Sequence, residues 1–84
     1  MLKKLVGRVT HFFPKAGVAV VEFKGELSVG EKICVEGAST LFYQAVESME
    51  VDKQKVERVS KDAVAGVKLA DRARAGDSVY KIVE

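Results

Sequence analysis

The chain has 84 residues, of which 48% are hydrophobic and 31% are charged, and its net charge is +2. This length allows one compact domain, and the composition is neither that of a disordered chain nor that of a membrane-embedded one. No apolar run approaches the roughly 20 residues that cross a bilayer, and the first residues lack the apolar core of a signal peptide. The single cysteine, Cys34, cannot form an internal disulfide, so we expect a cytoplasmic location.

Charge is distributed unevenly along the chain. Residues 1–21 carry four bases and no acid, residues 22–52 carry two bases and seven acids, and residues 53–84 carry eight bases and five acids. The three segments therefore have net charges of +4, −5 and +3. This pattern is consistent with two faces of opposite sign, and equally with a mixed, solvated surface.

The first part of the chain predicts two strands joined by a turn. Residues 5–13 alternate apolar and polar side chains, as a half-buried strand does. Gly7 inside this run indicates a bend or the close approach of another backbone. Pro14 ends the strand because it has no N–H to donate, and the β-branched run 18–23 indicates a second strand.

Turn signals and a change of phase mark the middle of the chain. Gly25 and Gly30 bracket a tight connection to a short strand at 33–35. A longer strand pattern covers 41–51, but its apolar positions change parity near Glu47–Ser48, which predicts a bulge and a bend there.

A helix over 41–61 is the alternative, since part of this region carries an i, i+3, i+4 apolar stripe. Turn signals at roughly every 8–12 residues favour strands instead. The last third predicts a strand at 64–69, a single helical turn over Asp71–Asp77 that ends at Gly76, and a final strand at 78–83.

Six to seven short strands predict an all-β fold, in which a single closed Greek-key β-barrel occupies residues 1–84. We expect closure because it removes the exposed edges of a sheet. Lys3 and Lys4 form a short basic N-terminal arm of this barrel.

Two turns in which a glycine precedes an acid and an apolar strand, Gly30-Glu31 and Gly76-Asp77, place glycine where positive φ is required. Together with Val46-Glu47-Ser48-Met49 and the strand at 65–69, in this order and spacing, they resemble domain II of the translation GTPases, the β-barrel after the G domain of elongation factor Tu. The run Val9–Val21 more closely resembles the C-terminal barrel of the collagenase-like peptidase family, which includes tRNA and ribosomal RNA hydroxylation proteins.

The resemblance implies a binding barrel without chemistry of its own. The chain has no Gly-x-x-x-x-Gly-Lys-Ser/Thr phosphate loop, and the catalytic domain of the peptidase family is absent from it. Residues 61–66 also lack the Ala-Gly-acid turn that usually precedes this strand in the elongation factors. We therefore expect a protein that is not an enzyme and that holds no nucleotide, cofactor or metal.

Aromatic side chains beside bases make His11–Lys15 the most informative segment. Strict alternation places Phe13 on the core face with Leu5 and Val9, and Phe12 on the opposite face. An exposed aromatic ring beside cations can stack on an unpaired base, although Phe12 could equally close one end of the barrel. The candidate nucleic-acid contacts are Lys3, Lys4, Arg8, His11, Phe12, Lys15, Arg72 and Arg74.

The sequence thus predicts an accessory barrel that binds tRNA or ribosomal RNA in translation or RNA modification. The alternative is a protein-interaction module that docks onto a separately encoded enzyme or translation factor. At the level of residues, Lys3 and Lys4 could instead be a frayed terminus, and the two arginines could pair with Asp71 and Asp77. The oligomeric state stays open, and no membrane contact is expected.

Overall fold

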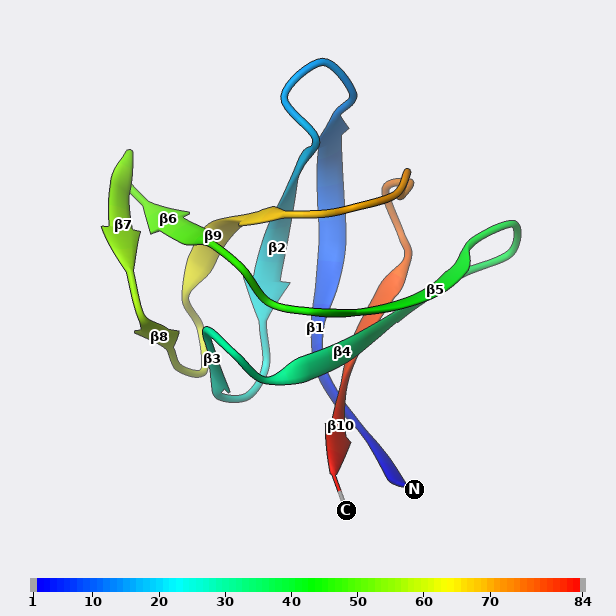
Figure 1. Ribbon diagram of the computed structural model, residues 1–84, viewed down its shortest axis with the longest axis horizontal. Coiled ribbons are helices and arrows are strands. Elements are labelled where there is room, and N and C mark those ends of the chain that lie inside the picture. Colours follow the sequence, from blue (N-terminus) through cyan, green and yellow to red (C-terminus); the bar gives the residue numbers. More distant parts are fainter. Residues whose placement is uncertain (1, 84) are drawn as a thin grey trace.

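The computed structural model describes residues 2–83, and within them it contains ten β-strands and no helix (Figure 1). The strands are β1 (Leu2–Phe13), β2 (Val18–Phe23), β3 (Leu27–Ser28), β4 (Lys32–Glu36), β5 (Leu41–Ala45), β6 (Met49–Val51), β7 (Gln54–Val56), β8 (Arg58–Val59), β9 (Val64–Lys68) and β10 (Ser78–Val83).

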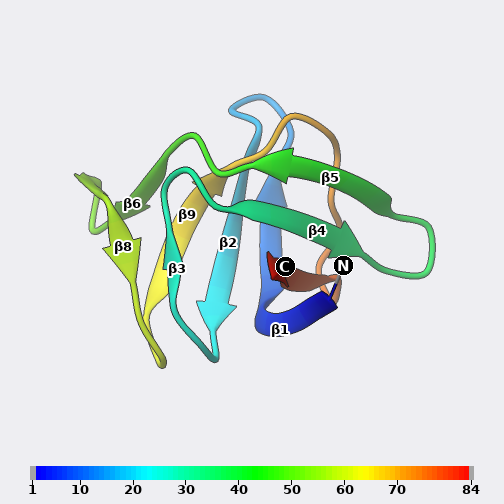
Figure 2. The ribbon, with the colours of Figure 1, turned by 60° about the horizontal axis from the view of Figure 1, so that its bottom comes forward.

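Eight of the strands form one antiparallel sheet in the order β5-β4-β10-β1-β2-β9-β6-β7, and β3 pairs with β8. The large sheet curls around a common interior (Figures 1 and 2). Its two edges, β5 and β7, do not pair with each other. The all-β prediction is confirmed, whereas the predictions of a closed barrel and of six to seven strands are wrong.

The segment that runs from β5 into β6 connects the two edge regions of the open sheet. β5 pairs with β4 at one edge, and the same stretch of chain then pairs with β9 near the other edge. The N–H of Val46 donates to the carbonyl of Glu31 at 2.9 Å, and the carbonyl of Ser48 accepts from the N–H of Lys68 at 3.0 Å. The predicted bend near Glu47–Ser48 is confirmed, but it separates two strands rather than forming a bulge within one.

Gln44 bridges the remaining gap with its side chain. Its Nε2 donates to the carbonyl of Lys68 at 3.1 Å, and its Oε1 accepts from the N–H of Ala70 at 2.7 Å. One amide side chain therefore connects the edge strand β5 to the segment that follows β9, at a place where no backbone ladder forms.

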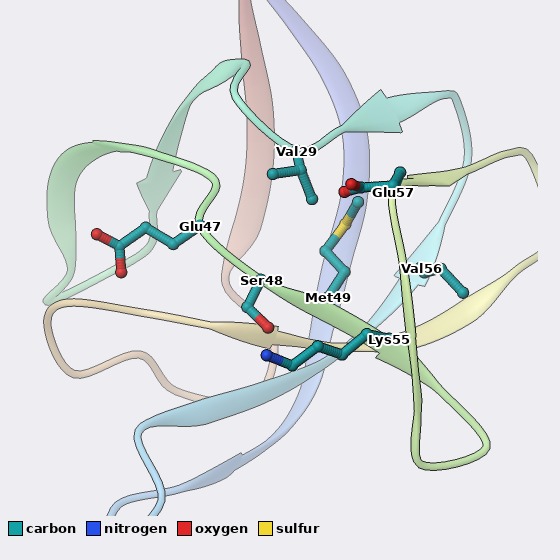
Figure 3. A pocket seen from close by; sticks show the side chains of 7 residues that line it. All are labelled: Val29, Glu47, Ser48, Met49, Lys55, Val56 and Glu57. Carbon is teal, nitrogen blue, oxygen red and sulfur yellow. The ribbon is translucent and has the colours of Figure 1, made fainter.

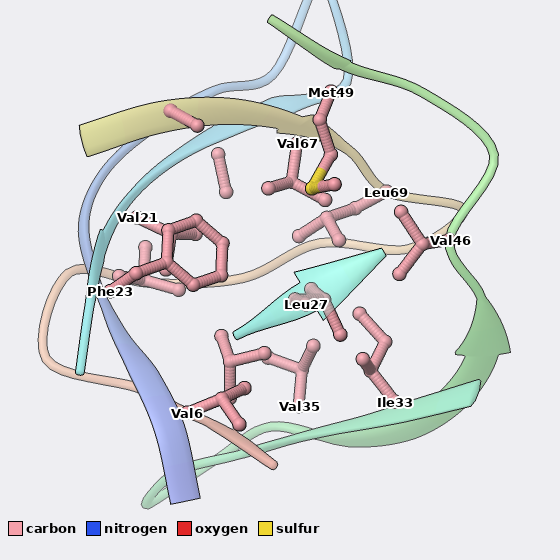
Figure 4. Close-up of a cluster of buried hydrophobic side chains, with 14 of the residues drawn as sticks. Val6, Val21, Phe23, Leu27, Ile33, Val35, Val46, Met49, Val67 and Leu69 are labelled. Atoms are coloured by element: carbon pink, nitrogen blue, oxygen red, sulfur yellow. The ribbon is translucent and has the colours of Figure 1, made fainter. Parts of the chain in front are cut away.

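Buried apolar side chains fill the interior as one cluster (Figure 4). Its bulkiest fully buried members are Leu27, Ile33, Met49, Val6, Val9, Val21, Val35, Val46 and Val67. They come from both halves of the sheet and from the small β3–β8 pair, so the fold has one core that all parts of the chain share.

Two register shifts in β1 decide which of its side chains face this core. Pairing with β10 shifts between Leu5 and Gly7, and pairing with β2 shifts between Val9 and His11. Each shift inserts an extra residue and reverses the alternation. Val6 is therefore 1% exposed, while Leu5, which strict alternation places inside, is 47% exposed.

The second shift exchanges the expected positions of two aromatic residues. Phe12 pairs with the buried Ala19 and packs against the core, whereas Phe13 is 49% exposed. The prediction that Phe13 shares the core face of Val9 is wrong because the bulge before His11 reverses the phase. The prediction that one aromatic ring of this segment lies outside the core is confirmed.

Three glycines behave as their sequence context predicts. A Cβ on Gly7 would lie 2.7 Å from a methyl carbon of Val21, which confirms a close approach at that point. Gly30 and Gly76 have φ values of +96° and +97°, a conformation that side-chain-bearing residues rarely adopt. Both lie in the turns that the sequence marks by a glycine followed by an acid.

The segment between β9 and β10 is extended rather than helical, so the predicted helical turn over 71–77 is wrong. It ends in a tight turn over 74–77, in which the N–H of Asp77 donates to the carbonyl three residues earlier at 3.0 Å. Ala73 is 2% exposed and both its neighbours are exposed, an alternation that an extended chain produces. Burial of Ala73 in the core outweighs its helix propensity.

Lys3 and Lys4 do not form a separate arm. Both lie within β1, where they pair with Ile82 and Lys81 of β10. Leu2 and Val83 consequently lie side by side, at the first position of β1 and the last of β10.

Candidate nucleic-acid interface

Four of the eight candidate residues meet at one hollow beside the end of β1. The hollow has a volume of about 370 Å³. Its walls are the end of β1 and the segment that leads to the turn before β10, and they consist of His11, Phe12, Pro14, Arg72, Ala73, Arg74 and Ala75. Two segments about sixty residues apart in the chain thus supply two rings and two guanidinium groups to one place. We call this hollow the arginine cleft.

The aromatic wall of the arginine cleft is held by the core beneath it. Phe12 is partly buried and packs against the central cluster, so its ring has little freedom to move. The ring of His11 lies against that of Phe13, with centroids 4.3 Å apart and an angle of 58° between the planes. Pro14 follows and begins the turn to β2.

The basic wall is set by the alternation around Ala73. Because Ala73 points into the core, Arg72 and Arg74 both project outward from the extended chain. The backbone N–H of Arg74 donates to Oδ2 of Asp77 at 2.9 Å, and Asp77 is only 5% exposed. The buried carboxylate therefore anchors the turn that carries the arginine.

The alternative that these arginines pair with neighbouring acids is not what the structure shows. Asp71 accepts a hydrogen bond from the backbone N–H of Arg72 at 2.7 Å, and Asp77 from the backbone N–H of Arg74. The ion pairs that residues 2–83 form lie elsewhere, at Lys3–Glu36, Glu26–Arg58 and Glu31–Lys81. Both guanidinium groups are thus available to a bound anion.

The other four candidates lie apart from one another and, in part, from the cleft. Lys15 follows Pro14 in the turn beside the cleft, and Arg8 lies in the middle of β1, opposite Glu22 of β2. Lys3 and Lys4 are at the far end of the same strand. The structure therefore does not place all the predicted basic residues on one surface.

Lys3 is also engaged with neighbours. Its Nζ donates to Glu36 at 2.7 Å and lies 5.0 Å from the centre of the Tyr80 ring. The hydrogen bond to the Glu36 carboxylate raises the pKa of Lys3 above its ordinary value.

A separate cavity of about 210 Å³ is smaller than the arginine cleft (Figure 3). The sequence did not indicate it. Its lining residues come from three short stretches of chain and are Val29, Glu47, Ser48, Met49, Lys55, Val56 and Glu57. No local motif could have revealed it, because the pairing of β6 with β7 and the hydrogen bond from the N–H of Val29 to the carbonyl of Glu57 bring these stretches together. Two acids and one lysine make it a poor site for an anion.

Two further features bear on the kind of site. Within residues 2–83, no helix has the length and hydropathy that a membrane crossing requires. The same residues hold no group of three or more His, Cys, Asp or Glu side chains placed to bind a metal ion.

Comparisons with known proteins relate the chain to one part of larger proteins. It is 36% identical over 80 residues to an uncharacterized protease of Methanocaldococcus jannaschii, and 31% identical over 81 residues to a collagenase of Porphyromonas gingivalis. Each alignment covers 94% of this chain but only 20% and 22% of those relatives, so the chain spans about a fifth of their length. No protein-family model matches the chain.

The fold has a clear counterpart among solved structures. The C-terminal domain of a putative U32 peptidase from Geobacillus thermoleovorans superimposes with a TM-score of 0.89 at 16% sequence identity, covering 95% of this chain and 93% of that one. The selenomethionine variant of that domain gives a TM-score of 0.86.

These relationships correct one expectation. Because the relatives are named as a protease and a collagenase, the prediction of a protein that is not an enzyme is wrong: the relationship points to an enzyme family, of which this chain matches a small part. The chain therefore has the fold of a U32 peptidase C-terminal domain and is related in sequence to one segment of proteins named as proteases and collagenases.

Proposed function

We propose that this chain acts as an accessory domain in a U32 peptidase-type system and that it binds single-stranded RNA in the arginine cleft. The observation that carries the proposal is the meeting of Phe12 and His11 with two arginines that form no ion pair among residues 2–83. Aromatic rings and guanidinium groups together are the means by which proteins hold unpaired bases and the phosphates between them.

The geometry favours a single strand over a duplex. A hollow of about 370 Å³ is large enough for one planar base, whereas a duplex keeps its bases stacked inside. The ring of Phe12 is fixed by the core and offers a surface for stacking, and the guanidinium groups can donate two hydrogen bonds each to a phosphate. A translation-factor-like role for the fold is part of the same proposal, and it is supported by the two glycine–acid turns at 30–31 and 76–77.

The proposal is tested by fluorescence anisotropy with a labelled ten-nucleotide single-stranded RNA, titrated with the whole chain at several salt concentrations. We expect the R72A/R74A double variant to bind at least tenfold more weakly than the wild type at low salt. Its plot of log affinity against log salt should also be shallower by about 1.4, which is the change expected when two phosphate contacts to a single strand are lost.

The matched control is the K53A/K55A double variant, which removes the same charge from the β6–β7 hairpin on the opposite side of the molecule (Figure 1). It should keep near-wild-type affinity. Equal losses in the two double variants would show attraction by net charge alone and would contradict the proposed site. Displacement of the RNA by an equally charged glutamate-rich peptide at the same concentration would assign the cleft to an acidic peptide instead.

A protein partner is the second candidate, and a row of side chains on the outer face of the sheet favours it. Leu5, Tyr80, Cys34 and Tyr43 lie directly opposite one another across four strands, and of these Cys34 is fully buried. Leu5 and Tyr43 are 47% and 49% exposed, and tyrosine is common in protein interfaces. If this face docks onto a peptidase domain, Y43E should abolish co-elution with that domain and leave RNA affinity unchanged.

A further inference from the structure

A second hollow adjoins the arginine cleft and shares its two arginines. It has a volume of about 190 Å³ and is lined by Ser39, Thr40, Leu41, Phe42, Asp71, Arg72 and Arg74. The two arginines therefore stand between two hollows, one walled by the end of β1 and the other by the β4–β5 hairpin. We call the second one the hairpin hollow.

The two hollows are held in fixed relation by a close contact. A Cβ on Gly37 would collide with Oδ1 of Asp77, so the buried carboxylate lies directly against the backbone at the start of the hairpin turn. The same carboxylate accepts the backbone N–H of Arg74 through its other oxygen. The Asp77 side chain thus contacts the β4–β5 hairpin and also holds the turn that carries Arg74.

Besides the two shared arginines, the hairpin hollow has polar groups that the arginine cleft lacks. Ser39 and Thr40 carry hydroxyl groups, which can both donate and accept hydrogen bonds. Asp71 uses one carboxylate oxygen for the backbone N–H of Arg72, and its other oxygen has no hydrogen-bond donor within the described chain. A carboxylate repels phosphate but accepts from an exocyclic amino group, such as N4 of cytosine. The hairpin hollow therefore suits a base rather than a phosphate.

We infer that the two hollows form one site for two consecutive nucleotides of single-stranded RNA; this inference rests on the proposed function. One base lies against Phe12 in the arginine cleft, and Arg72 and Arg74 bind the phosphate that joins the nucleotides. The next base enters the hairpin hollow beside Phe42, where Asp71 favours a base with an exocyclic amino group over uracil.

The first arm of the test measures affinity as a function of length. Calorimetric titrations of the whole chain use cytidine monophosphate, the dinucleotide CpC and oligocytidylates of three and four nucleotides, all at low salt. We expect affinity to rise at least tenfold from one nucleotide to two and less than threefold with each further nucleotide. A mononucleotide that binds as tightly as the dinucleotide overturns the two-nucleotide site.

The second arm measures base preference. We expect the wild type to bind CpC about fivefold more tightly than UpU, a difference at the low end of what one base-specific hydrogen bond provides. D71A should lose this preference, whereas the control E47A removes an exposed acid elsewhere and should keep it. Equal affinity of the wild type for CpC and UpU, or a preference that survives in D71A, overturns the role of Asp71.

The two arms separate this inference from the proposed function. If the ten-nucleotide RNA binds and R72A/R74A weakens it, but length and base have no effect, the proposed function stands and the two-nucleotide site is wrong. If the ten-nucleotide RNA does not bind to the wild type, both are wrong. L41S is a further check, since Leu41 is 65% exposed and its loss should weaken CpC without destabilising the fold.

Discussion

Basic and aromatic side chains meet at both ends of β1, but the two ends differ in the partners of their cations. At the first end, Lys3 is bound to Glu36 and lies over the ring of Tyr80. At the other end, His11 and Phe12 face two arginines that form no ion pair within residues 2–83. Lys3 at the first end is thus paired within the fold, whereas the two arginines at the other end are available to a ligand.

This difference shows that the number of bases in a segment is a poor guide to binding. Residues 1–21 are the most basic stretch relative to their acids, yet Lys3 at the first end lies next to the acid Glu36 and the ring of Tyr80, both on other strands. The arginines lie beside Asp71 and Asp77 in sequence, yet both acids accept backbone N–H groups instead. Which cations remain unpaired is decided by the residues that the fold places next to them, and not by their neighbours in the sequence.

The largest effect on stability is expected from Gly37→Ala, which disturbs the contact between Gly37 and Asp77 that supports the turn carrying Arg74. The new methyl group would collide with the Asp77 carboxylate, which is buried and cannot move aside without breaking its bond to Arg74. We expect a loss of about 2–3 kcal/mol in the free energy of unfolding, as for other overpacked sites, measured by urea denaturation.

Gly25→Ala is the control for that substitution. A Cβ on Gly25 would meet a methyl carbon of Val6 at 3.5 Å, an ordinary contact. Its stability should therefore stay within about 0.5 kcal/mol of the wild type, as for most unstrained substitutions. If both alanine variants were equally stable, Asp77 would not pack tightly against the hairpin.

The next largest effect on stability is expected at Phe12, and its neighbour Phe13 serves as the comparison. Phe12→Ala should cost about 2 kcal/mol, because the ring packs against the core but is only partly buried. Phe13→Ala should cost less than about 1 kcal/mol, since that ring is 49% exposed. Thermal or urea unfolding of both variants measures the difference, and the opposite order would place the bulge in β1 elsewhere.

The same pair of residues shows how far the sequence could predict the fold. The all-β character, the turns at Gly30 and Gly76, and the bend near Glu47–Ser48 followed from local patterns of apolar residues and glycine. The two extra residues in β1 did not, because their positions are set by pairing with β2 and β10, and Gly7 indicated only a bend near the first of them. One such residue was enough to exchange the roles of Phe12 and Phe13.

The candidate site was predictable only in part for a related reason. Residue type and local spacing identified His11, Phe12, Arg72 and Arg74, which the structure brings together. The sequence did not indicate the hairpin hollow, because Ser39 and Thr40 form an ordinary turn motif. Their meeting with the arginines depends on the Asp77 contact with Gly37, a long-range contact that no spacing along the chain reports.

The smallest effect is expected at the first end of β1, from the pH dependence of the Lys3–Glu36 pair. The hydrogen bond to Glu36 raises the pKa of Lys3 in the folded state above its ordinary value. The pair therefore stabilises the fold fully below the ordinary lysine pKa, and this contribution is lost as the pH rises through the raised value. The effect is small because both side chains are exposed to solvent.

Urea denaturation of the wild type and of Lys3→Met, at neutral and at strongly alkaline pH, measures this contribution. The wild type should be slightly more stable at neutral pH, and the difference should vanish once Lys3 has lost its proton. Lys4→Met is the matched control, because Lys4 takes part in none of the ion pairs among residues 2–83 and its loss should give no pH-dependent difference. A Lys3→Met difference that persists at alkaline pH would mean that Lys3 stabilises this end through the packing of its stem on Tyr80 rather than through its charge.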